Sequence, residues 1–255
     1  MILAIDIGNT HTVIGGIDAE KTRFVERVST DRNRTDLEYA VLLRNALNLH
    51  GITDGTIEGA IVSSVVPPVT QAIRGAVQKV LGITPMQVSA GMKSGMNIRM
   101  DNPASVGSDL IADAVGALSC YPAPLIIFDF GTASTVSVID RDRNYIGGMI
   151  FPGVALSLSA LSARTAQLPA IDLTAPKKLI GTNTVDCMKA GVIYSNAAAM
   201  DGLTERISEE LGQKATAVAT GGLAKLIVPY CRTGIILDED LLLKGLRVFY
   251  EKNKR

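Results

Sequence analysis

The sequence contains no tryptophan, only two histidines and three cysteines, and no excess of charge of either sign. The two histidines, His11 and His50, exclude a His-rich metal site. Cys120, Cys187 and Cys231 lie far apart and form no CxxC pair, a pattern typical of reduced thiols in a cytosolic protein rather than of a disulfide framework. With 25 basic against 25 acidic residues, the chain lacks the positive excess of a general nucleic-acid or acidic-membrane binder.

Long apolar runs are also missing. No segment approaches about 18 uninterrupted apolar residues, so we expect no membrane span. The apolar start MILAIDIGNT has no basic region and soon reaches Asp6, so we expect a buried strand there rather than a secretory signal. These absences predict a cytoplasmic protein.

The chain does contain ample apolar material for a core, since 47% of its 255 residues are hydrophobic and 20% are charged. This length suits one large domain or two of about 120 residues. Apolar runs predict buried strands at 2–7, 59–66, 86–89, 125–130 and 217–220. Two hairpins are predicted, one formed by 12–18 and 22–29 and the other by 134–139 and 144–150.

Helical patterns fill most of the remaining sequence. Thr35-Asp36-Leu37-Glu38 has the spacing of a capping box and predicts a helix that ends at Gly51. Further helices are predicted at 67–81, 108–118, 153–164, 184–211 and 239–253, and a loop at 90–107. Pro122 and Pro124 follow the helix predicted at 108–118, so we expect a domain boundary there and two domains, 1–118 and 119–255.

The start of each predicted domain has the same order of elements: a strand, a glycine turn, a hairpin, and then alternating helices and strands. Under a shift of 123 residues four positions are identical: Asp6 and Asp129, Gly8 and Gly131, Thr12 and Thr135, and Val13 and Val136. Four identities alone are weak, but the shared order of elements favours a duplicated α/β fold.

The two glycine turns are candidates for phosphate binding. Asp6 ends a buried strand, Gly8 allows successive N–H groups to point into one space, and Thr10 and Thr12 add hydroxyl groups. The stretch Asp129-Phe130-Gly131-Thr132-Ala133-Ser134 repeats this design. A structural hairpin turn with local side-chain hydrogen bonds is the alternative for either copy. The repetition favours two turns that hold the two ends of a triphosphate in an interdomain cleft.

Two further features carry possible chemistry. Asp109 follows Gly107 and Ser108 at the start of a predicted helix, with Asp113 on the same helix face. Asp109 is either a general base or simply an acid favoured by the helix dipole. Gly221-Gly222 follows a predicted strand, and this turn either admits a flat ligand such as adenine or is a tight packing turn.

Together these stretches resemble the type III pantothenate kinases, within the superfamily of actin, Hsp70 and sugar kinases. The matching stretches follow family order over almost the whole chain: DIGNTHTV (6–13), DNPASVGSD (101–109), FDFGTAST (128–135), GGMIFPG (147–153), IGTNTVDCMKAG (180–191), MDGL (200–203), ATGGLA (219–224) and LLLKGLR (241–247). The resemblance implies two duplicated ribonuclease-H-like domains with an interdomain cleft.

The resemblance also implies an ATP-dependent kinase that phosphorylates pantothenate on the way to coenzyme A. By this resemblance Asp109 is the proton acceptor, Asp129 binds a monovalent cation (K⁺ or NH₄⁺), and Thr184 contacts pantothenate across a dimer interface. Asp6 is expected to position the γ-phosphate through Mg²⁺ and water. The implied ATP-binding residues are Asp6, Ile7, Gly8, Asn9, Thr10, His11, Thr12, Val13 and Thr132.

The substrate side departs from the family at two positions. The implied substrate-binding residues, besides Thr184, are Met100, Gly107, Ser108, Asp109 and Leu110. The family usually has Tyr in place of Met100 and Arg in place of Leu110, and an arginine is a natural partner for the carboxylate of pantothenate. Three explanations stay open: another cation such as Arg99 or Arg164, a less charged acceptor, or a partner subunit that completes the pocket.

Several functions are therefore compatible with the sequence. The leading hypothesis is a pantothenate kinase that forms a homodimer and binds neither nucleic acid nor membrane. The alternatives are a related kinase with a different alcohol acceptor, a polyphosphate-type hydrolase, and a catalytically weak paralogue. The last would bind nucleotide and regulate a true kinase, or pair with it as a heterodimer.

Overall fold

The computed structural model describes residues 1–53, 55–89 and 91–254. Its internal contacts divide the chain into two compact units, each built on one mixed β-sheet. The first unit comprises Met1–Met96, Asp101–Ser119 and Asp240–Arg255, and the second comprises Asn97–Met100 and Cys120–Glu239.

Apart from Ser119, which lies in the first unit, these units differ in two segments from the continuous ranges 1–118 and 119–255 expected from the sequence. The last helix belongs to the first unit because its Leu243, Leu246 and Phe249 pack in one buried cluster with residues of the first sheet. Residues 97–100 belong to the second unit because Asn97 and Ile98 pair with a strand of its sheet.

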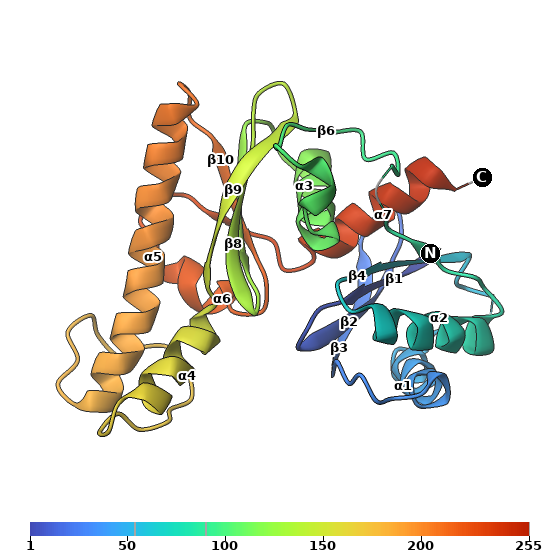
Figure 1. Ribbon diagram of the computed structural model, residues 1–255, viewed down its shortest axis with the longest axis horizontal. Coiled ribbons are helices and arrows are strands. Elements are labelled where there is room, and N and C mark those ends of the chain that lie inside the picture. The colour runs from blue at the N-terminus through green and yellow to red at the C-terminus, as the bar shows by residue number, and fades with distance from the viewer. Residues whose placement is uncertain (54, 90, 255) are drawn as a thin grey trace. The chain divides into compact units, whose positions relative to one another are not determined.

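The sheet of the first unit has the order β3-β2-β1-β4-β5 (Figure 1). Its strands are β1 (Ile2–Ile7), β2 (His11–Ile17), β3 (Thr22–Ser29), β4 (Gly59–Ser64) and β5 (Met86–Gln87). The first three strands are antiparallel, whereas β4 and β5 run parallel to β1. The continuous apolar run of β1 fits a central strand that is covered on both faces.

Helices cover both faces of this sheet. They are α1 (Asp36–Leu49), α2 (Pro67–Leu81), α3 (Ser108–Cys120) and α7 (Leu241–Asn253), with a short 3₁₀ turn at Pro103–Ser105. In Figure 1, α1 and α2 lie side by side, and their apolar residues share a buried cluster with one face of the sheet. Residues of α3 and α7 share the cluster on the other face.

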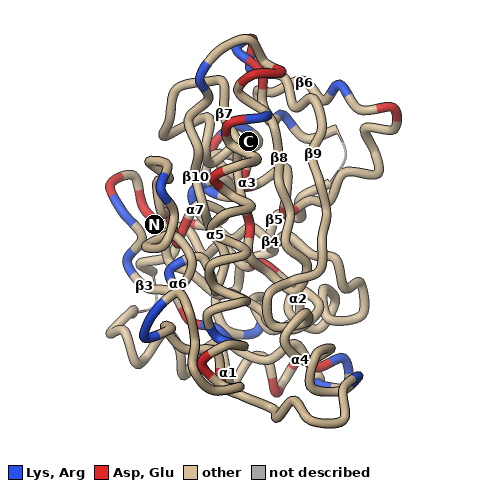
Figure 2. The backbone as a smooth tube through the Cα atoms, turned by 90° about the vertical axis from the view of Figure 1, so that its left-hand side faces the viewer, with Lys and Arg blue, Asp and Glu red and all other residues tan. Residues whose placement is uncertain are grey.

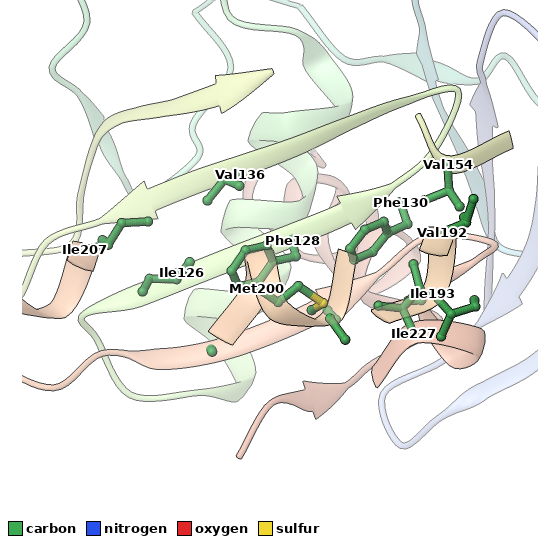
Figure 3. Close-up of a cluster of buried hydrophobic side chains, with 14 of the residues drawn as sticks. Ile126, Phe128, Phe130, Val136, Val154, Val192, Ile193, Met200, Ile207 and Ile227 are labelled. Carbon is green, nitrogen blue, oxygen red and sulfur yellow. The ribbon is translucent and has the colours of Figure 1, made fainter. Parts of the chain in front are cut away.

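The sheet of the second unit has the order β11-β10-β7-β8-β9-β6. Its strands are β6 (Asn97–Ile98), β7 (Leu125–Phe130), β8 (Ala133–Ile139), β9 (Asn144–Pro152), β10 (Thr216–Thr220) and β11 (Ile236–Leu237). Its helices are α4 (Val154–Arg164), α5 (Thr184–Glu210) and α6 (Ala224–Ile227), followed by a 3₁₀ turn at Val228–Tyr230. Figure 3 shows the core of this unit, in which Phe128 and Phe130 of β7 lie among apolar residues such as Ile193 and Met200 of α5.

The two sheets have the same topology. The order β9-β8-β7-β10-β11 repeats β3-β2-β1-β4-β5, and in both the first three strands are antiparallel and the last two are parallel to the central strand. The second sheet adds β6 beside β9. This repetition confirms the predicted duplicated α/β fold.

The strand registers correct the predicted sequence alignment of the two copies. Two residues separate β7 from β8, whereas three separate β1 from β2. Thr12 therefore corresponds to Ser134, since Thr12 lies opposite Ile7 and Ser134 lies opposite Phe130. By the same reasoning Val13 corresponds to Thr135. The expected pairs Thr12–Thr135 and Val13–Val136 are wrong because the second turn is one residue shorter.

Most predicted elements are present. The capping box is formed, with Thr35 Oγ1 accepting from Glu38 N and Glu38 accepting from Thr35 N. The loop predicted at 90–107 instead contains β6 and the 3₁₀ turn, and its first residue, Ala90, lies outside the described residues.

No helix in the described part of the chain is both long and apolar enough to cross a bilayer. Figure 2 shows basic and acidic residues interspersed along the chain, in keeping with their equal numbers.

Candidate functional site

The first candidate turn, between β1 and β2, is closed by hydrogen bonds of its own. Gly8 N donates to His11 O at 3.0 Å, and Thr30 N donates to Thr10 O at 2.9 Å. The hydroxyl of Thr30 donates to the Gly8 carbonyl at 2.8 Å and lies 2.9 Å from Thr12 Oγ1. Thr30 was not among the residues that sequence reasoning singled out, because it directly follows β3 and carries no motif.

The eight predicted ATP-binding residues of this stretch fall into three groups by burial. Ile7 and Thr12 are buried, whereas Asn9, Thr10 and His11 expose their side chains at the tip of the turn. Asp6, Gly8 and Val13 are partly buried. The exposed tip can therefore meet a ligand while the buried residues anchor it.

The second candidate turn, Gly131–Thr132, differs from the first in what supports it. Gly153, at the position equivalent to Thr30, packs so closely that a Cβ there would overlap the carbonyl oxygen of Thr132. The hydroxyls of Ser134 and Thr135 are buried and find no hydrogen-bond partner among the described residues. This turn therefore retains donor capacity that the first turn uses internally.

The start of α3 carries the predicted proton acceptor. Asp109 is partly exposed, its Oδ1 accepts from Leu110 N at 2.9 Å, and a Cβ at Gly107 would overlap that same oxygen. Glycine at position 107 therefore makes room for the carboxylate. Asp113 follows one turn later and is only 1% exposed.

A pair of serines connects this helix start to the first sheet. Ser63 lies directly opposite Asp6 in the β1–β4 ladder and is fully buried. Ser63 Oγ and Ser108 Oγ share a hydrogen bond of 3.0 Å. The residue next to Asp109 is thus anchored beside the strand that carries Asp6. Sequence reasoning missed Ser63 because it lies far from Ser108 along the chain.

Met100 belongs to the second unit, and its Sδ lies 4.0 Å from the position that a Cβ on Gly147 would occupy. The strand before it is fixed by Arg99 N, which donates to Tyr145 O at 2.8 Å, and by Asn97 Nδ2, which donates to Asn144 Oδ1 at 3.2 Å.

Asn144 also anchors this edge through Asp140. Burial opposes ionisation of Asp140, but hydrogen bonds from the side chain and backbone of Asn144 outweigh it and hold the pKa of Asp140 below its usual value. An ionised Asp140 in turn accepts hydrogen bonds from Asn144 Nδ2. This fixes the orientation of the Asn144 amide, whose Oδ1 accepts from Asn97 Nδ2.

Thr184 begins α5, directly after the helix cap Asn183, whose Oδ1 accepts from Asp186 N at 2.9 Å. It lines a cavity of about 570 Å³ together with Leu161 of α4 and Cys187 and Asn196 of α5.

The Gly221–Gly222 turn follows β10. Gly221 has a φ of +90°, and a Cβ there would overlap Asp129 Oδ1 and lie 2.6 Å from Phe130 N. Gly221 therefore allows this turn to pack closely against β7. Close packing was one of the two expected roles of the turn, the other being space for a flat ligand. Leu223, just after it, lines a second cavity of about 540 Å³ with residues of α4 and of the segment 168–173.

The described residues contain no group of three or more His, Cys, Asp or Glu side chains placed to hold a metal ion. Cys120 and Cys187 are exposed, Cys231 is partly buried, and none of the three forms a disulfide within the described part of the chain. Burial and the nearby Asp201 raise the pKa of the Cys231 thiol to about 11, so this thiol stays protonated at neutral pH.

Two sheets of identical topology, each with a carboxylate at the end of its central strand and a glycine turn after it, define the class. The molecule has the expected fold of two duplicated ribonuclease-H-like units. Comparisons with known proteins refine this assignment.

The family model for type III pantothenate kinase matches residues 2–206. A type III pantothenate kinase of Bacillus cytotoxicus is 43% identical over 253 residues, which cover 99% of this chain and 97% of that protein. The chain belongs to the type III pantothenate kinase family, which confirms the predicted resemblance.

Solved structures agree on the fold. A Baf family protein from Campylobacter jejuni has a TM-score of 0.60 at 17% identity, with 99% of this chain and 98% of that chain covered. The activator of 2-hydroxyisocaproyl-CoA dehydratase from Clostridium difficile, with bound ADPNP, has a TM-score of 0.53 at 14% identity, with 99% and 96% covered.

Proposed function

We propose that this protein transfers the γ-phosphate of ATP to the hydroxyl of pantothenate. The bond between the γ-phosphorus and the β,γ-bridging oxygen breaks, a bond from phosphorus to the acceptor oxygen forms, and the products are ADP and a phosphate ester. Family membership supports this reaction over a catalytically weak partner protein. Phosphoryl transfer asks the protein mainly to position the groups and neutralise charge.

One observation carries the catalytic assignment. Through Ser108 and Ser63, the start of α3 is tied to the strand position opposite Asp6. Asp109 is therefore supported beside the strand end that we assign to the γ-phosphate. We assign to Asp109 the proton released by the attacking hydroxyl.

We assign ATP phosphates to the stretch Asp6–Val13 and to Thr132. The exposed tip of the first turn, the exposed Thr132 and the buried hydroxyl of Ser134 are donors of the kind that phosphate oxygens need. Mg²⁺ commonly takes one or two protein carboxylates together with phosphate oxygens. Asp6 fits this role, and Mg²⁺ bound there would neutralise charge on the phosphates.

We place the adenine in the cavity of about 540 Å³ beside Leu223. It is lined mainly by apolar residues, such as Leu158 of α4 and Ile171. This size and character suit a flat aromatic base. Ala163, which is exposed and lines the same cavity, offers a test, since Ala163→Trp should raise the KM for ATP and leave that for pantothenate unchanged.

The acceptor side is assigned to Met100, Gly107–Leu110 and Thr184. Pantothenate binding through Thr184 of a second copy requires a dimer, and exposed apolar side chains of the second unit support one. Apolar side chains there are exposed on β9, α4, the segment before α5 and α5 itself: Met149, Ile150, Leu156, Leu161, Leu179, Ile180 and Val185. Exposed apolar surface of this kind commonly marks a protein interface. A cytoplasmic homodimer is therefore part of the proposal.

We also assign a monovalent cation, K⁺ or NH₄⁺, to Asp129. Its carboxylate lies at the end of β7 with the buried hydroxyl of Thr135 opposite it in the ladder. Oxygen ligands of this type suit a hard cation.

The test is ADP release by the purified chain with ATP, Mg²⁺ and KCl, with and without pantothenate. The proposal expects pantothenate-dependent ADP release and a phosphorylated product identified by mass. ADP release that is equal without pantothenate would indicate a hydrolase. ATP binding without any turnover would indicate a partner or regulatory role.

A further inference from the structure

The hydroxyl of Thr135 on β8 is buried without a hydrogen-bond partner among the described residues. A buried polar group without a partner is uncommon in native proteins, and a bound ion or water is one of its ordinary explanations. A hydroxyl in this state has lost its hydrogen bonds to water without gaining others, so a bound ligand would restore a partner to it.

The neighbours of Thr135 identify the kind of ligand. Thr135 lies directly opposite Asp129 in the antiparallel β7–β8 ladder. On the other side of Asp129, the parallel ladder with β10 places the buried Thr220 opposite the same residue. Residues paired across a ladder project to the same face of the sheet. The Asp129 carboxylate is therefore flanked by two threonines at one end of the sheet.

Gly221 holds the carboxylate against this end of the sheet. A side chain at this position would overlap Asp129 Oδ1, and the φ of +90° disfavours any residue with a Cβ. The turn after β10 thus reserves the space that the carboxylate occupies.

The duplicated first unit shows that the fold does not need this hydroxyl. Val13 stands at the position equivalent to Thr135, opposite Asp6. Ser63 stands at the position equivalent to Thr220, and its hydroxyl is engaged by Ser108 at 3.0 Å. Of the two copies, only the second combines the strand-end carboxylate with a buried hydroxyl directly opposite that has no partner among the described residues.

We propose that Thr135 Oγ1 is a ligand, together with the Asp129 carboxylate, of the monovalent cation. One carboxylate with neutral hydroxyl oxygens carries a single negative charge, which matches K⁺ or NH₄⁺. The Asp129 charge disfavours an anion here, and divalent sites built from protein alone use more carboxylates. This inference rests on the cation that we assign to Asp129 under the proposed function.

The experiment follows the melting temperature of the full chain with saturating ADP and Mg²⁺ while KCl replaces choline chloride at constant ionic strength. Thr135→Val keeps the shape of the side chain and matches Val13 of the first unit, so we expect it to fold. Removing one oxygen ligand should raise the KCl concentration for the half-maximal shift by about tenfold. Thr135→Ser should stay close to wild type.

Thr204→Val is the matched control, because Thr204 on α5 is another buried hydroxyl without a partner among the described residues. It should leave the potassium dependence unchanged. A wild-type midpoint in Thr135→Val, or an equal change in Thr204→Val, would overturn the role of Thr135. If Thr135 proves unimportant but Asp129→Asn removes the potassium-dependent shift in melting temperature, the assignment of the cation to Asp129 is kept. A wild-type chain without any potassium-dependent shift or rate would overturn the cation and its ligand together.

Discussion

Thr30 supports the glycine turn of the first unit, and Gly153 stands at the equivalent place in the second. The threonine hydroxyl engages both Thr12 and the Gly8 carbonyl. The glycine has no side chain to offer Ser134, and its backbone instead packs against the carbonyl of Thr132. Two copies with one topology have thus reached different states of hydrogen bonding.

This difference teaches which parts of a duplicated fold are free to diverge. Strand order and the buried central strands are shared because both cores depend on them. Hydroxyls at the strand ends lie outside those apolar clusters. They can be paired internally in one copy and kept for a ligand in the other.

The acids at two helix starts differ in the same way. Asp109, at the start of α3, is partly exposed, and its Oδ1 accepts from the adjacent Leu110 N. Asp240, the cap residue of α7, accepts from Thr22 Oγ1 and forms an ion pair of 2.8 Å with Lys244. We therefore expect chemistry from the first acid and stability from the second.

The largest expected effect, on kcat, comes from replacing Asp109 and tests its contrast with Asp240. Asp109→Asn should lower kcat by about 10²–10⁴-fold, because the amide keeps the shape of the carboxylate but takes no proton. ATP affinity, measured by titration, should stay within a few-fold. Asp240→Asn is the control and should lower the melting temperature with kcat near wild type. An Asp109→Asn enzyme that retains most of its kcat would refute the assignment.

The second prediction concerns Leu110, which stands where the family usually has Arg. Leu110→Arg should lower the KM for pantothenate about ten- to a hundredfold, since a charge-assisted contact to a carboxylate contributes about 1.5–3 kcal/mol. The KM for ATP should not change. Steady-state kinetics and oligomer mass are measured on the same variant. Unchanged kinetics with unchanged mass would show that position 110 does not face the acceptor.

Stability should distinguish the two turns. Thr30→Val removes the partner of the buried Thr12 hydroxyl and should lower the free energy of unfolding by about 1–3 kcal/mol. Ser134→Ala removes a hydroxyl that bonds to no described residue, and we expect a change below about 0.5 kcal/mol. Urea unfolding of the ligand-free chain provides the comparison. Equal destabilisation by both substitutions would mean that the turns are supported alike.

The smallest effect concerns acid sensitivity. Burial opposes ionisation of Asp201, but hydrogen bonds from Thr233 Oγ1, Thr233 N and Arg232 N outweigh it and lower the pKa of Asp201 below its usual value. A lowered folded-state pKa means that the stabilisation is present above the unfolded pKa and lost as the pH falls through the folded one.

Asp201→Asn should therefore show a smaller fall in melting temperature than wild type between about pH 6 and pH 3. Glu38→Gln provides the same comparison in the first unit, where hydrogen bonds from Thr35 lower the pKa of Glu38. An Asp201→Asn curve parallel to wild type would exclude this contribution.

Much of the fold could be predicted because its signals are local. Apolar runs, glycine turns and the capping box at Thr35 each depend on a few adjacent residues, and all appear in the structure. The predicted candidate residues Asp6, Asp109 and Asp129 were found in the same way, from a carboxylate beside a glycine at the end of a strand or the start of a helix. Their family assignment needed several such stretches in order along the chain.

The sequence by itself therefore determined the elements, the duplication and the family. Tertiary structure decided that α7 belongs to the first unit, that Thr12 corresponds to Ser134, and that Ser63 supports Ser108. It also decided that Thr30 closes one turn, while the Thr135 hydroxyl opposite Asp129 bonds to no residue that the structure describes. The physical reason is distance along the chain. Periodicity and turn chemistry act over a few residues, whereas register and hydroxyl pairing depend on segments that meet only when the sheets form.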